Sequence, residues 1–177
     1  MKRTQFLFVI LFVVAAFALV FISVRKPTVA DASAGGLIPP AQAKLAPDFT
    51  LQSFHLRTES AKQPIVLDFW ATWCGPCREE LPHLVTLSKK YAGRVAFYGI
   101  NSSDTLADIA TFSRQEGISF PTLSDARHTV AAQYGVEAIP LLIVIDIHGK
   151  VRAVSMGYDE NVEQNLPKVL DAVLKEK

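Results

Sequence analysis

The chain has 177 residues, half of them hydrophobic, and its 18 Lys and Arg nearly balance its 17 Asp and Glu. Beyond Lys44 there are 13 basic and 16 acidic residues, so this part lacks the basic excess that marks a nucleic-acid-binding protein. The chain has only two cysteines, Cys74 and Cys77, which excludes a scaffold of several widely spaced disulfides.

The hydrophobic excess lies at the N-terminus, where Ser23 is the only polar member of an apolar run over residues 6–24. A helix of this length spans about 28 Å, close to the hydrocarbon thickness of a bilayer. A core helix would have a polar face, and this segment has none. We therefore expect residues 1–26 to form a transmembrane signal anchor. The alternative is a cleavable signal peptide, although its apolar region should be shorter.

Residues 27–45 are rich in Ala, Gly and Pro and have no periodic pattern, which predicts a flexible linker. A partly ordered first strand is the alternative. From residue 46 to residue 177 the predicted elements alternate as in one α/β domain. The predicted strands cover 49–51, 65–70, 95–100, 120–123, 141–147 and 151–155, and the predicted helices cover 75–91, 106–116, 128–134 and a final segment.

The final helix is expected to begin near Asn165, because Pro167 fits a first turn. Strands that are separated by helices pair in parallel, and a hairpin around Gly149 adds an antiparallel edge. The sequence therefore predicts a mixed central sheet with helices on both faces.

The strongest chemical signal is Trp73-Cys74-Gly75-Pro76-Cys77, between a predicted buried strand and a predicted helix. The positive end of a helix dipole favours a thiolate, so Cys74 at the helix start is expected to be the attacking sulfur. Cys77 lies one turn further and can resolve a mixed disulfide. Pro76 suits the first helical turn, which does not use its missing donor.

Two other interpretations of the cysteine pair are weaker. A structural disulfide that closes so short a loop adds little stability. A zinc site needs about four ligands, and the four histidines are scattered along the chain. We expect no metal and no bound cofactor.

Three motifs in this order resemble thioredoxins: the active-site segment 66–77, the helix proline in Leu81-Pro82, and Ala138-Ile139-Pro140, which is similar to the cis-proline loop. The resemblance covers about residues 46–177 and implies a thioredoxin-like fold with a redox-active Cys74–Cys77 disulfide. The N-terminal anchor, the segments 46–51 and 77–82, and an extra stretch over 106–125 are similar to the membrane-anchored TlpA/ResA-like branch.

The resemblance also suggests two catalytic acids. Asp68 interrupts an apolar strand; a buried carboxyl has a raised pKa, so Asp68 is expected to accept the Cys77 proton. Its alternative is a solvated strand end. Glu80 is predicted to tune the thiol pair or else to be an ordinary solvated carboxylate. The branch commonly has Asn in place of Asp68, and many members have Thr in place of Leu141, so the particular substrate is left open.

Substrate binding is expected around the cysteines and the proline loop. A cis Pro140 would leave backbone groups of Ile139 free to pair with an extended segment. Trp73, Gly75 and Pro76 complete the predicted substrate surface, with Trp70 in the core. The alternatives are a trans proline that starts a strand, and a Trp73 that belongs to the core.

The predicted function is that of an enzyme, a thiol–disulfide oxidoreductase. The resemblance implies a protein of the bacterial inner membrane that faces the periplasm or another extracytoplasmic compartment. It implies reduction of envelope proteins, including apocytochromes c, with electrons from a membrane thiol-transfer protein. The alternatives are an oxidant or isomerase of the same fold, a copper-delivery module, a peroxidase, and a secreted periplasmic form after signal cleavage.

Overall fold

The computed structural model describes residue 29 and residues 36–176. The predicted membrane anchor and the first part of the predicted linker lie outside this part of the chain. Within the described residues, no helix has both the length and the hydrophobicity that a membrane span requires.

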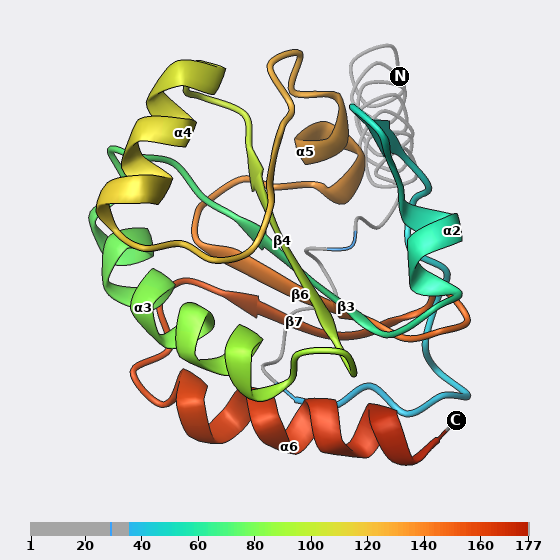
Figure 1. Cartoon of the computed structure of the whole chain (residues 1–177). Coiled ribbons are helices and arrows are strands. Elements are labelled where there is room, and N and C mark those ends of the chain that lie inside the picture. Colours follow the sequence, from blue (N-terminus) through green and yellow to red (C-terminus); the bar gives the residue numbers. More distant parts are fainter. Residues whose placement is uncertain (1–28, 30–35, 177) are drawn as a thin grey trace, which may run out of the picture.

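A five-stranded mixed sheet forms the centre of the molecule (Figure 1). Its strands are β3 (Ile65–Phe69), β4 (Ala96–Asn101), β5 (Thr122–Ser124), β6 (Leu141–Ile145) and β7 (Val151–Met156), in the spatial order β5-β4-β3-β6-β7. β3 is parallel to β4, and β4 to β5, whereas β6 pairs antiparallel with both β3 and β7. The predicted mixed sheet is confirmed, and every residue of β3 and β6 is buried.

Helices cover both faces of this sheet, as predicted. Because side chains alternate along a strand, Val66 and Val144 face a core with α3 (Gly75–Lys90), α4 (Leu106–Gln115) and α6 (Val162–Lys175). Leu67 and Ile143 face the other core, which holds residues of α2 (Leu56–Ser60) and α5 (Thr129–Tyr134).

Two regions of the domain differ from the prediction. The β1–β2 hairpin (Thr50–Leu51 with Phe54–His55) and the helix α2 lie where only one short strand was expected. α6 begins at Val162 rather than near Asn165, so Pro167 lies inside the helix. The Asp159 carbonyl and side chain accept hydrogen bonds from the N–H groups of Val162 and Asn161, which starts the helix early. The proline removes one donor from the following turn.

The second half of the predicted linker is hydrogen-bonded to the domain. The Ile38 N–H donates to the Arg152 carbonyl at 2.6 Å, and the Val151 N–H donates to the Lys44 carbonyl at 2.8 Å. Leu45 forms an antiparallel bridge with Lys150. Residues 38–45 therefore lie along β7. This arrangement is closer to the alternative of a partly ordered first strand than to the predicted flexible linker.

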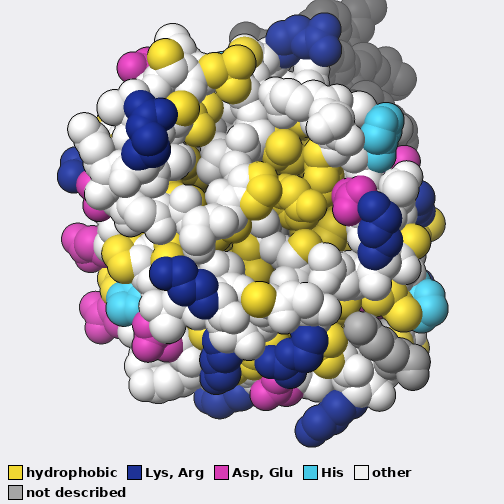
Figure 2. Space-filling view, viewed as in Figure 1, with side chains coloured by type: hydrophobic (Ala, Val, Ile, Leu, Met, Phe, Trp, Pro, Cys, Tyr) yellow, Lys and Arg dark blue, Asp and Glu magenta, His cyan; other side chains and the backbone are white. Residues whose placement is uncertain are grey.

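β4 has an open outer edge, because the short strand β5 pairs only with Gly99–Asn101. Beside the rest of β4 lies a hollow of about 320 Å³ that is lined by residues including Phe97, Tyr98 and Phe120. Figure 2 shows hydrophobic side chains towards the centre of this face, with charged groups mostly around its edge. No predicted site residue lines this hollow.

Candidate active site

Cys74 and Cys77 form a disulfide, with an S–S distance of 2.05 Å and a Cα–Cα distance of 5.3 Å. Cys74 is the N-cap residue of α3, and its sulfur accepts a hydrogen bond from the Cys77 N–H at 3.2 Å. The neighbouring Trp73 is 67% exposed, whereas Trp70 is buried. Both tryptophans and the helix start are placed as predicted, so a sulfur lies where helix N–H groups can stabilise its negative charge.

The loop before Cys74 is held by a carboxylate that the sequence did not reveal. Asp104 accepts hydrogen bonds from the Thr72 N–H at 2.8 Å, the Thr72 hydroxyl at 2.7 Å and the Asn101 amide at 2.7 Å. Burial alone would raise the pKa of Asp104, but these hydrogen bonds outweigh it and lower the pKa. Thr72 and Asp104 are 32 positions apart and share no pattern that could have predicted their contact.

Asp68 lies in β3 and is 2% exposed. Neither of its carboxyl oxygens has a hydrogen-bond partner within the described residues. Burial raises the pKa of Asp68 well above the ordinary value, and the nearby Glu80 carboxyl raises it further. The alternative of a solvated strand end is excluded, and the raised pKa makes the buried carboxyl a better proton acceptor than an ordinary aspartate.

Glu80 lies on the inner face of α3 and is 1% exposed, whereas its neighbour Glu79 is exposed. One Glu80 carboxyl oxygen is buried without a partner among the described residues. Burial, and then the charge of Asp159, raises the pKa of Glu80 to about 7. The structure therefore excludes an ordinary solvated carboxylate at this position.

The proline loop stands at the same end of the sheet as the cysteines. The Ile139–Pro140 peptide bond is cis, as predicted. β6 begins directly after Pro140, and its first residue, Leu141, pairs with Phe69 at the end of β3. Gly75 and Pro76 are exposed at the start of α3. The cysteine segment and the proline loop, predicted from two separate motifs, thus come together at one edge of the domain.

A pocket of about 370 Å³ adjoins this edge, with Trp73 and Ile139 in its lining. Its walls are mostly hydrophobic and include residues that the sequence did not single out, such as Ile100, Ala131 and Val136. They come from β4, α5 and the loop after α5, so only the folded chain brings them together. Across residue 29 and residues 36–176, no three His, Cys, Asp or Glu side chains are grouped as they would be around a metal ion.

Residues 43–154 match the model of the AhpC/TSA family. The chain belongs to this family. It is 30% identical over 131 residues to the thiol-disulfide oxidoreductase ResA of Geobacillus thermodenitrificans, an alignment that covers 70% of this chain and 75% of the relative. It is also 30% identical to the thioredoxin-like protein YneN of Bacillus subtilis, over 63% of this chain and 69% of the relative.

Among solved structures, the fold is similar to a thiol:disulfide interchange protein of the thioredoxin family from Chlorobium tepidum. The TM-score is 0.65 at 26% identity, and the alignment covers 77% of this chain and 99% of that protein. The AhpC/TSA protein described here is therefore a thiol–disulfide oxidoreductase with a thioredoxin-like fold, close to ResA-type enzymes, as the three motifs predicted.

Proposed function

We propose that this protein is a membrane-anchored reductase of disulfides in proteins of the bacterial cell envelope. Residues 1–26 would hold it in the inner membrane, with the domain from residue 46 on the extracytoplasmic side. Apocytochromes c are candidate substrates, and a membrane thiol-transfer protein would restore the dithiol. The observation that carries the reductase proposal is the Cys74–Cys77 disulfide at the start of α3, in a domain with two buried acids, Asp68 in β3 and Glu80 in α3.

The reaction begins from the reduced form. The Cys74 thiolate attacks one sulfur of the substrate disulfide, and the other substrate sulfur leaves as a thiolate. The Cys77 thiol then gives its proton to Asp68 and attacks the Cys74 sulfur, which releases the second substrate sulfur as a thiolate. Two electrons pass to the substrate, and the protein is left with the Cys74–Cys77 disulfide. Asp68 is suited to receive this proton, because its pKa is raised and its oxygens have no hydrogen-bond partner among the described residues.

A polypeptide substrate suits the surroundings of Cys74. Backbone groups of Ile139 can pair with an extended segment, and the exposed Trp73 ring offers an apolar contact next to the attacking sulfur. The adjoining pocket of about 370 Å³ can receive a side chain that follows the substrate half-cystine.

The test is capture of reaction intermediates in cells. Cys77→Ala in the full chain should accumulate mixed disulfides through Cys74, and mass spectrometry would identify the envelope proteins attached. Cys74→Ala is the matched control and should capture none. If Cys77→Ala gives no mixed disulfides with envelope proteins, the proposed substrate class is wrong.

The direction of electron flow needs its own measurement. A reductase is expected to have a reduction potential nearer to about −270 mV, as in thioredoxin, than to about −120 mV, as in the strong oxidant DsbA. A value at the oxidising end would favour the alternative of an oxidant or isomerase. Separately, removal of residues 1–26 should release the protein from isolated membranes if this segment is the anchor.

A further inference from the structure

A small cavity separates Glu80 from the surface of the molecule. It has a volume of about 40 Å³ and lies between α3, β7 and α6. Its lining is mostly hydrophobic but includes the polar side chains of Glu80, Ser155, Asp159 and Asn165. A water molecule needs at least about 10–15 Å³ of such volume and 2–4 polar partners. The cavity therefore has the size and the polar groups to hold an ordered water.

The two carboxyl groups in this lining have different surroundings. Glu80 is 1% exposed, and one of its oxygens has no partner within the described residues. Asp159 is only partly buried, and its oxygens accept hydrogen bonds from the Asn161 N–H at 2.8 Å and the Asn165 amide at 2.9 Å. Asp159 is thus held at the start of α6, between the cavity and solvent.

We propose that the proton given up by Cys77 leaves the site through Glu80, a water molecule in this cavity, and Asp159. The proposal rests on the proposed function and adds a positioning residue, Asp159, to it. Asp68 and Glu80 lie close enough for the Glu80 charge to act on Asp68, so Glu80 is the next acid on the path.

The transfer balances as a relay of a single proton. The Cys77 S–H bond breaks when its sulfur bonds to Cys74, and the proton binds Asp68. The proton then passes from Asp68 to the Glu80 carboxylate. Glu80 donates a proton to the water, and the water donates one of its own protons to Asp159. Asp159 finally releases a proton to solvent. Each carboxyl ends in the protonation state in which it began, and no other reactant is needed.

Burial and the neighbouring charge of Asp159 raise the pKa of Glu80 to about 7, so Glu80 can exchange protons near neutral pH. Asp68 faces it from β3, and Asp159 faces it from the loop before α6. Desolvation raises the pKa of Tyr158 in the same loop, and the charges of Glu79, Glu160, Glu80 and Asp159 raise it further. No Lys or Arg lines the cavity, so no basic side chain there holds Glu80 ionised.

The experiment follows the reduced full-length protein as it reacts with a small aromatic disulfide, from pH 5 to pH 9. The first thiolate released reports attack by Cys74, and the second reports attack by Cys77. Ala153→Val adds volume to the cavity lining, and Asp159→Asn removes the acidic group while it keeps an oxygen for the Asn161 N–H. Glu160→Gln removes an exposed charge one residue away from Asp159 and is the matched control.

Both cavity variants should slow the second phase by about tenfold, less than the factor of 10²–10⁴ typical of a lost general base. In both cavity variants the first phase should keep its wild-type rate. In Glu160→Gln both phases should keep their wild-type rates. Asp159→Asn should also move the acid limb of the second phase to lower pH, because the lost charge no longer raises the pKa of Glu80. Asp159→Glu should restore the second phase.

Wild-type second-phase rates and pH profiles in both Ala153→Val and Asp159→Asn would overturn the proton path. That result would leave the proposed function intact, since the wild-type protein would still show both phases. If the wild-type protein released no second thiolate at any pH, the dithiol reaction itself would be wrong.

Discussion

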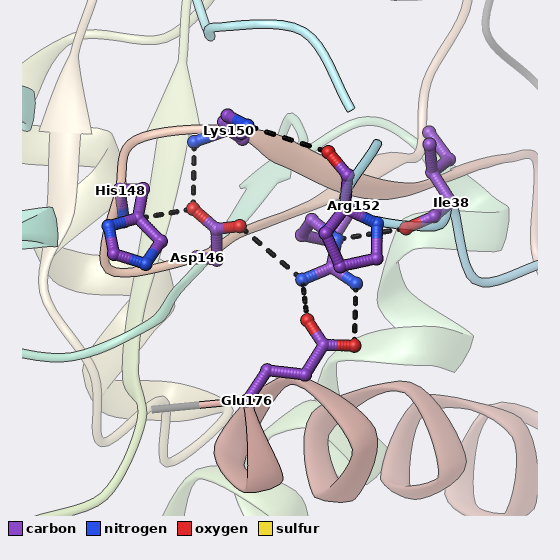
Figure 3. A network of polar contacts seen from close by, with 7 residues as sticks. Ile38, Asp146, His148, Lys150, Arg152 and Glu176 are labelled. Carbon is purple, nitrogen blue, oxygen red and sulfur yellow. Dashed lines mark hydrogen bonds and ion pairs between the residues drawn. The ribbon is translucent and has the colours of Figure 1, made fainter. Parts of the chain in front are cut away.

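The Arg152 side chain donates a hydrogen bond of 2.9 Å from Nε to the carbonyl oxygen of Ile38, 114 residues earlier in the chain. The same guanidinium bonds Asp146 at 3.3 Å and both carboxyl oxygens of Glu176 (Figure 3). Arg152 is 1% exposed. One buried arginine therefore joins the segment before β1, the β6–β7 turn and the end of α6.

Replacing this arginine should be strongly destabilising. Arg152→Met keeps much of the volume but leaves the buried carboxyl of Asp146 without its cation, and such a loss costs about 3–5 kcal/mol. The free energy of unfolding in urea measures this loss. Proteolysis should also cut residues 38–45 faster, since Ile38 loses its side-chain partner.

Arg57→Met is the control for the arginine variant, because Arg57 pairs with Asp48 at 3.9 Å on the surface. It should change stability by less than about 1 kcal/mol. Equal losses in the two variants would contradict the role assigned to the buried network.

Removing the Asp68 charge should stabilise the protein at neutral pH. The folded-state pKa of Asp68 is raised, so the native state binds more protons than the unfolded state and stability falls as pH rises from about 4 through that pKa. Asp68→Asn removes this loss, and the expected gain near pH 8 is on the order of 1–3 kcal/mol. Urea unfolding of the oxidised protein at pH 4 and pH 8 should show a gain only at the higher pH.

Glu79→Gln provides the comparison, because Glu79 is an exposed carboxyl on the same helix as Glu80. The free energy of unfolding of Glu79→Gln should have the same pH dependence as that of the wild-type protein. Asp68→Asn should meanwhile slow attack by Cys77 on the mixed disulfide. A gain that is the same at both pH values would mean that the Asp68 charge is not its cause.

The pocket beside Trp73 should select substrates by the residue that flanks the half-cystine. Ala131→Phe places a ring in the pocket and should lower kcat/KM by about tenfold for a disulfide peptide with a flanking Phe, compared with a flanking Gly. Reduction of a small disulfide should be unaffected. Ala132→Phe adds the same ring at an exposed neighbouring position outside the lining, and should change neither rate.

Gly99 in β4 should not tolerate a methyl group. A Cβ at this position would lie 2.5 Å from Nε1 of Trp70 and 2.7 Å from the hydroxyl of Thr122. Gly99→Ala should therefore cost about 1–3 kcal/mol in the free energy of unfolding. Gly75→Ala, where a Cβ meets nothing within 4 Å, should leave stability nearly unchanged. A near-neutral Gly99→Ala would mean that Trp70 moves freely.

Much of the fold was predictable because its buried strands are mostly apolar. The runs 65–70 and 141–147 predicted β3 and β6, since few other local structures bury every side chain. α6 was misplaced at its start because Pro167 favoured a first turn, whereas the Asp159 carbonyl and side chain begin the helix earlier. α2 is five residues long, too short for a helical period to appear in the sequence.

The reactive part of the site was predictable and its supporting part was not. Cys74, Cys77 and Pro140 belong to local motifs, and Asp68 stood out as a charge within an apolar run. Whether Glu80 is buried depended on how α3 meets α6. The contact of Asp104 with Thr72 depended on how two loops meet, which local patterns do not record.

The register of β6 and β7 places the Ile38 segment away from the path by which a substrate reaches Cys74. Met156, at the end of β7, pairs with Leu141 beside the proline loop, whereas Val151, next to Arg152, pairs with Ile145 at the opposite end of the strands. The Ile38 segment thus joins the domain at the pole far from the sulfurs. The segment at Ile38 therefore leaves the approach to Cys74 open.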